Sequence, residues 1–135
     1  MVRVQPEKKP LPGFRSFHVT TFFHDNYPMA EQFIRHKKSL LHYKMLGNAD
    51  NILFIFHGFG QDHQAFQSIA ETLSAHYTLF VFDLYFHGKS EWEYGEIPLE
   101  KEHWKKTITM LLQKHHIEKF SLAGFSLGGK FVLAT

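Results

Sequence analysis

The chain has 135 residues, 44% of them hydrophobic and 16% aromatic, which is enough apolar material for one soluble globular domain. Its formal net charge is only +2, and no basic run is interleaved with aromatic residues, so a nucleic-acid surface is not indicated. The absence of cysteine excludes disulfides and cysteine-based zinc sites. Because the apolar runs are too short for a membrane span or a signal peptide, we expect a cytoplasmic protein with no membrane partner.

The first thirty residues differ in composition from the rest. Three prolines stand among the first twelve residues, and they restrict regular structure in a stretch that can bury little. Ser16–Phe23 is apolar enough for a short strand, but the turn residues Asp25–Pro28 follow it. We therefore predict a leader of uncertain structure at 1–30 and a domain at 31–135.

The strands are predicted from apolar runs between turn residues. Gln32–His36 and Leu40–Leu46, joined by a short polar turn, are typical of an antiparallel hairpin. Ile52–Phe56, Tyr77–Phe82 and Phe120–Ala123 have no internal polar break or almost none, which is the pattern of strands buried on both faces.

Two helices separate these apolar strands. Asp62 is a predicted N-cap for the first, and each helix has apolar residues at helical spacing. The first stripe comprises Phe66, Ile69, Ala70 and Leu73; the second, within Leu99–His116, comprises Trp104, Ile108, Leu111 and Leu112. Alternation of strands and helices after a hairpin predicts an α/β fold, a mostly parallel sheet flanked by helices that binds ligands at the carboxyl ends of its strands.

A serine stands where the last strand passes into a helix, in the sequence Gly124-Phe125-Ser126-Leu127-Gly128. A sharp turn between strand and helix lifts such a hydroxyl clear of the sheet, and only small residues fit two positions before and after it. The amino end of the following helix favours an alkoxide or an oxyanion. The pattern therefore indicates that Ser126 is a nucleophile.

Two further loops follow predicted strands, His57-Gly58-Phe59-Gly60 and D-L-Y-F-H-G-K-S from Asp83 to Ser90. Together with the Ser126 turn, and in this order, they resemble the α/β-hydrolase family over about residues 32–135. The resemblance implies the N-terminal half of an α/β-hydrolase fold. One departure is Phe86, which stands where the family's D-x-x-G-x-G-x-S loop has its first glycine.

The resemblance also implies roles for residues of the three loops. Ser126 would be the nucleophile, and the backbone N–H groups of Phe59 and Leu127 would form the oxyanion hole. The remaining residues would shape the loops: His57, Gly58, Gly60, Asp83, Gly124 and Gly128.

Three competing patterns are incomplete. Gly88-Lys89-Ser90 ends like a phosphate-binding loop, but Asp83 stands where that loop needs its first glycine. A dinucleotide fingerprint beginning at Gly58 would need a third glycine where His63 stands. Loop histidines His57, His63 and His87 could converge on zinc, but there is no H-E-x-x-H. We expect no cofactor and no metal.

The general base that a serine nucleophile needs is missing from the residues after Ser126. In this family the acid and the histidine follow the nucleophile, whereas residues 127–135 contain neither. We therefore expect a truncated domain that is inactive alone. The complete protein would be a serine hydrolase with a small-molecule substrate, a carboxylic ester or related acyl compound, which it cleaves through an acyl-enzyme. An upstream base, His57 or His87, would break the family's order.

The alternative is a non-catalytic truncated domain that binds a small molecule or a partner protein. The strand at Phe120–Ala123 would be an apolar sheet edge in such a chain, and unpaired edges are prone to pairing. Self-association through this edge is the expectation that follows.

Overall fold

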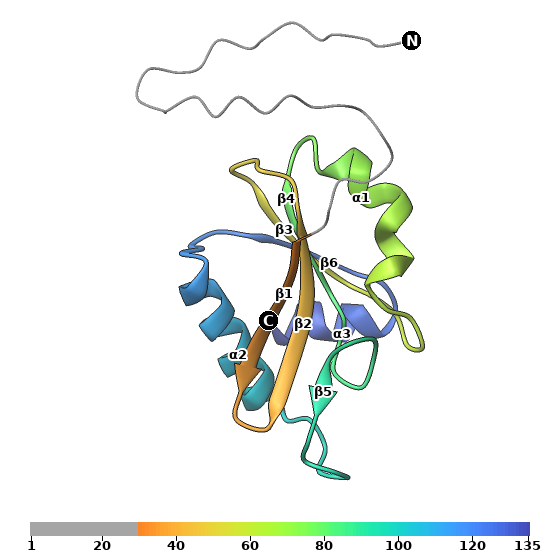
Figure 1. The fold of residues 1–135 in the computed structure, drawn as a ribbon, viewed down its shortest axis with the longest axis vertical. Helices are drawn as coiled ribbons and strands as arrows, with labels where there is room; N and C mark the ends of the chain where they lie inside the picture. The colour runs from red at the N-terminus through yellow and green to blue at the C-terminus, as the bar shows by residue number, and fades with distance from the viewer. Residues whose placement is uncertain (1–29) are drawn as a thin grey trace, which may run out of the picture.

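The computed structural model describes residues 30–135, which form a six-stranded sheet with three α-helices (Figure 1). The strands are β1 (Ala30–His36), β2 (Ser39–Leu46), β3 (Ile52–Phe56), β4 (Thr78–Phe82), β5 (Glu91–Trp92) and β6 (Ser121–Gly124). The helices are α1 (Gln67–Leu73), preceded by a 3-10 turn η1 (His63–Phe66), α2 (Lys101–Lys114) and α3 (Leu127–Ala134). Residues 1–29 of the predicted leader, including its strand at 16–23, lie outside the described residues, and Ala30 is the first residue of β1.

The sheet order is β1-β2-β4-β3-β6, with β5 paired to β2. β1 and β2 form the predicted antiparallel hairpin, and β2 also runs antiparallel to β4. β3 lies between β4 and β6 and is parallel to both. The prediction of an α/β fold with an initial antiparallel hairpin is confirmed. Within the part of the chain that the structure describes, β6 pairs with β3 alone and so forms one edge of the sheet.

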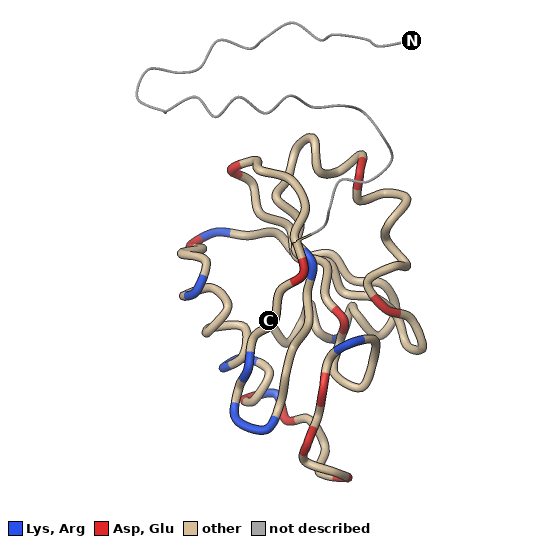
Figure 2. Tube along the Cα trace, viewed as in Figure 1, with Lys and Arg blue, Asp and Glu red and all other residues tan. Residues whose placement is uncertain are grey.

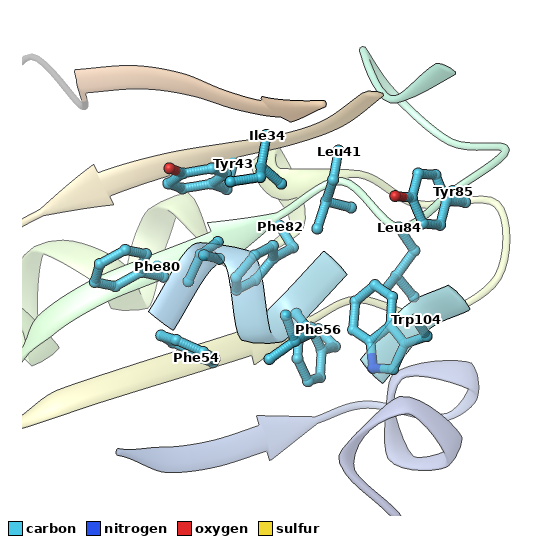
Figure 3. Close-up of a cluster of buried hydrophobic side chains, with 12 residues drawn as sticks. Ile34, Leu41, Tyr43, Phe54, Phe56, Phe80, Phe82, Leu84, Tyr85 and Trp104 are labelled. Carbon is cyan, nitrogen blue, oxygen red and sulfur yellow. The ribbon is translucent and has the colours of Figure 1, made fainter. Parts of the chain in front are cut away.

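Alternate residues of the central strands supply two cores. Phe54 and Phe56 of β3 face a large aromatic cluster with Trp104 of α2 (Figure 3), and partly buried side chains of α3 pack against it. Leu53 and Ile55 face the opposite side, where Ala70 of α1 covers them. This two-residue period with both faces buried is what a strand between two helical layers requires. Helices therefore cover both faces of the sheet, as predicted.

Two details differ from the sequence predictions. Ile69, expected in the buried stripe of the first helix, is 48% exposed. Phe66, Ala70 and Leu73 pack against the core as expected, so the buried stripe is narrower than predicted and Ile69 lies on its solvent side. The loop predicted after Ser90 contains β5, which pairs with the beginning of β2. Asp62 is an N-cap, as predicted, but of the 3-10 turn η1 that precedes α1: its side chain accepts a hydrogen bond from the Gln64 N–H at 2.8 Å.

A membrane-spanning helix would need about 20 apolar residues. None of the helices in residues 30–135 is long and apolar enough to meet that requirement.

Candidate active site

Ser126 lies on the turn between β6 and α3 with backbone angles φ 53° and ψ −112°. Such angles are sterically unfavourable for a residue with a Cβ, and they occur most often where function requires them. The turn is held by a hydrogen bond from Phe125 N–H to the Phe56 carbonyl at 3.0 Å. Ser126 is exposed, so its hydroxyl is open to a substrate.

The glycines on either side of Ser126 have no space for a side chain. A Cβ on Gly124 would lie 2.5 Å from the carbonyl carbon of Gly128. A Cβ on Gly128 would lie 2.2 Å from the carbonyl oxygen of Phe56. Both distances are far inside van der Waals contact, so the close approach of α3 to the ends of β3 and β6 depends on glycine at each position.

The loop after β3 is oriented by His57, which is fully buried. Its Nδ1–H donates to the Gly58 carbonyl at 2.7 Å, and its Nε2 accepts from the Leu84 N–H at 2.9 Å. The same carbonyl accepts from the Gln61 N–H at 3.2 Å. In a trans peptide the C=O and the following N–H point in opposite directions, and residues 30–135 contain no cis bond. The Phe59 N–H is therefore directed away from His57.

The predicted oxyanion donors lie at equivalent positions of neighbouring strand ends. Phe56 pairs with Gly124 in the parallel ladder, and Phe59 and Leu127 each follow three residues later. Neither N–H has a hydrogen-bond partner within the described part of the chain. A Cβ on Gly58 would lie 3.0 Å from the Phe125 ring, so the two loops are in contact beside Ser126.

Asp83 anchors the third loop through a carboxylate with no exposed surface. Oδ1 accepts from the backbone and ring N–H groups of His63 at 2.7 and 2.8 Å. Oδ2 accepts from His42 Nδ1–H at 2.7 Å and from Lys89 N–H at 2.9 Å. Burial alone would raise the pKa of Asp83, but these hydrogen bonds outweigh it and hold the pKa well below its ordinary value.

The sequence interpretation missed two members of this network. His42 donates from its second ring nitrogen to Glu31 at 3.0 Å, and Lys89 contacts the same Glu31 oxygen. The only available signal was a histidine within the apolar run of β2, because its partner Asp83 lies 41 residues away.

The three loop histidines considered for zinc do not converge. His57 and His87 are in edge-to-face contact at 4.9 Å, whereas His63 binds Asp83. A different group, His42, His63 and Asp83, brings one ligand atom from each residue within 4.8 Å. Hydrogen bonds between these residues account for that spacing, and we assign no ion to them.

The histidines considered as upstream bases have both ring nitrogens occupied. His87 donates from Nδ1 to the Tyr85 carbonyl at 3.0 Å and accepts at Nε2 from the Gly60 N–H at 3.0 Å. His57 is engaged in the same manner, and burial lowers its pKa below the ordinary value. Neither ring has a free nitrogen that could take the Ser126 proton.

A family model of the alpha/beta hydrolase fold matches residues 51–135, which include all three strand-end loops. The chain therefore belongs to the α/β-hydrolase fold family. No curated protein matches it.

Solved structures of low sequence identity share the fold. A presumed epoxide hydrolase from Pseudomonas aeruginosa, in a mutant form, is 19% identical with a TM-score of 0.70, covering 80% of this chain and 36% of its own. The thioesterase domain from the curacin biosynthetic pathway is 22% identical with a TM-score of 0.64, covering 75% and 38%. A membrane phospholipase A is 22% identical with a TM-score of 0.63, covering 75% and 33%. The chain thus spans between 33% and 38% of the length of these structures.

Proposed function

We propose that this chain carries the nucleophile and the oxyanion-binding loops of a serine hydrolase that cleaves carboxylic esters or related acyl compounds. The observation that carries the proposal is the backbone of Ser126, held at φ 53° between β6 and α3 beside two N–H groups that have no hydrogen-bond partner among residues 30–135. Membership of the α/β-hydrolase family, and the hydrolase names of structures with the same fold, support it.

The proposed reaction begins at the turn. Ser126 Oγ attacks the carbonyl carbon of the ester, and its proton passes to a base outside residues 127–135, which contain no acid and no histidine. The Phe59 and Leu127 N–H groups donate to the oxygen that becomes negative. The bond to the leaving alcohol then breaks as the alcohol takes a proton, and water hydrolyses the acyl-Ser126 intermediate to the acid.

The exposed rim of the site favours an apolar acyl group. The Phe59 side chain is 82% exposed and that of Phe125 is 61% exposed, although large apolar side chains are normally buried. Leu127 is partly buried beside them. An apolar substrate would cover these side chains and remove their surface from water.

A fluorophosphonate probe with mass-spectrometric site mapping tests the proposal. We expect covalent labelling at Ser126, faster when imidazole is added as an external base, and none at this position in Ser126→Ala. Ser121→Ala is the matched control, since Ser121 is an exposed serine five residues upstream on β6 and its loss should leave labelling unchanged. A chain that stays unlabelled at Ser126 even with imidazole contradicts the proposal.

A second candidate is a binding role through the open side of the domain. Within the described residues β6 pairs on one side only, and exposed sheet edges recruit further strands. Leu133 of α3 is 86% exposed beside a hollow of about 310 Å³ lined partly by Trp104 and Phe131. We propose self-association through this edge. Sedimentation that shows one monomeric species at all concentrations would exclude it.

A further inference from the structure

Two peptide units meet at Phe59, and a different imidazole holds each of them. The unit between Gly58 and Phe59 is held through the Gly58 carbonyl, which accepts from His57 at 2.7 Å. The unit between Phe59 and Gly60 is held through the Gly60 N–H, which donates to His87 Nε2 at 3.0 Å. The φ and ψ angles of Phe59 are the rotations that relate these two planes. The Phe59 N–H lies in the first plane, and holding the second plane as well restricts rotation of the first about the φ and ψ angles of Phe59.

The two imidazoles tie the loops together reciprocally. His57, from the loop after β3, accepts from the Leu84 N–H of the loop after β4. His87, from the loop after β4, accepts from the Gly60 N–H of the loop after β3. The rings contact each other at 4.9 Å with planes 64° apart, and the Phe59 ring packs edge-on against His87 at 5.7 Å. Each loop thus supplies one ring and one amide to the other.

The hydrogen bonds also determine which nitrogen of His87 is protonated. Its Nδ1 faces the Tyr85 carbonyl at 3.0 Å, which can only accept, so the proton is on Nδ1. Nε2 is then free of a proton and accepts from Gly60. A side chain that offers an acceptor at the Nε2 position can replace this function, and one that offers none cannot.

We infer that His87 is a positioning residue, which acts through Gly60 to aim the Phe59 N–H at the oxyanion. This inference rests on the proposed function. His87 itself does not touch the reacting atoms. Its effect on catalysis comes from the direction of one donor, and misplacing an oxyanion donor slows a reaction about tenfold to a thousandfold.

Three variants of the full chain test the inference. His87→Phe keeps a planar ring without an acceptor, His87→Gln can place Oε1 near the former Nε2 position, and His76→Phe makes the same change at an exposed site. We measure the Phe59 and Gly60 amide resonances, the hydrogen exchange of Gly60, and the rate of fluorophosphonate labelling at Ser126. His87→Phe should shift both resonances, deprotect Gly60 and slow labelling about tenfold or more. His87→Gln should restore most of the wild-type resonance positions, Gly60 protection and labelling rate, and His76→Phe should match the wild type in all three.

A measurement on the unmodified chain covers the case in which His87→Phe fails to fold. An N–H···N hydrogen bond transmits a scalar coupling between Gly60 nitrogen and His87 Nε2, and its absence from the wild-type chain overturns the inference. Unchanged labelling in His87→Phe, with the Gly60 amide altered, also overturns it, because the ring would then be structural only. A wild-type chain with the coupling but without any labelling at Ser126 disproves the proposed function instead, and the catalytic role of His87 falls with it.

Discussion

Two of the histidine groups in residues 30–135 differ in whether a carboxylate takes part. In the Asp83 network, His42 and His63 donate to one buried carboxylate. In the hairpin network, His36 and His103 stack at 4.1 Å and bind the hydroxyl groups of Thr107 and Ser39 respectively. A carboxylate stabilises a protonated imidazole, whereas a hydroxyl in a buried setting does not.

The surroundings of the hairpin network increase this difference. Burial lowers the pKa of His36, and the charge of Lys37 lowers it further. Burial also lowers the pKa of His103, with contributions from His36 and Lys37. Figure 2 shows the lysines of the β1–β2 turn beside this region. The Asp83 carboxylate of the first network is therefore held in its charged form, whereas the histidines of the second network are held neutral.

The largest effect on stability is expected from Asp83→Asn, which alters the Asp83 network. The amide would direct an NH₂ group at donors that now bind a carboxylate, and removing one partner of a buried charged pair costs about 3–5 kcal/mol. Urea unfolding should show that loss or no cooperative transition. The control is Glu93→Gln, which removes an exposed carboxylate 4.0 Å from Arg35 and should change the free energy of unfolding by under about 0.5 kcal/mol. Similar values for both variants would refute the anchoring role of Asp83.

The pH dependence of stability should separate the two networks. A histidine whose pKa is lower in the folded chain leaves the folded state with fewer protons than the unfolded state. Its stabilising contribution is present above the ordinary value of 6.5 and is lost as pH falls below it. His57 and His115, whose pKa values burial also lowers, act in the same direction.

The Asp83 carboxylate affects stability in a lower pH range than the histidines. The pKa of Asp83 is lowered by its hydrogen bonds, so its contribution is present above the ordinary value of 3.8 and is lost only below it. The unfolding free energy should therefore decline first below about pH 6.5 and again below about pH 3.8. His103→Gln should make the first decline shallower and leave the second unchanged. A single decline below pH 4 in the unmodified chain would show that the hairpin network does not resist protonation.

The sequence predicted what depends on local pattern. The turn at Ser126, the loop at His57 and the order of strands and helices follow from residues close together in the chain, because glycine spacing and apolar periods act locally. The contacts that orient the site join distant segments. A single sequence identifies neither the partner of His42 nor the ring positions of His57 and His87. Ile69 was misplaced because the buried stripe of its helix is narrower than the apolar pattern indicated.

The smallest effect on stability is expected at the turn between β1 and β2, next to the hairpin network. Lys37 has a φ of 54°, which is unfavourable for a residue with a Cβ, so Lys37→Gly should stabilise the chain by about 0.5–1 kcal/mol after the entropic cost of glycine. It also removes the charge that lowers the pKa of His36, so the decline below pH 6.5 should become shallower. Lys38→Gly is the matched control, because it removes an equal charge from a residue without a positive φ and should destabilise the turn. Equal changes in the unfolding free energy of the two glycine variants would show that backbone strain at Lys37 contributes nothing. An unchanged decline of stability below pH 6.5 in Lys37→Gly would show that the Lys37 charge does not keep His36 neutral.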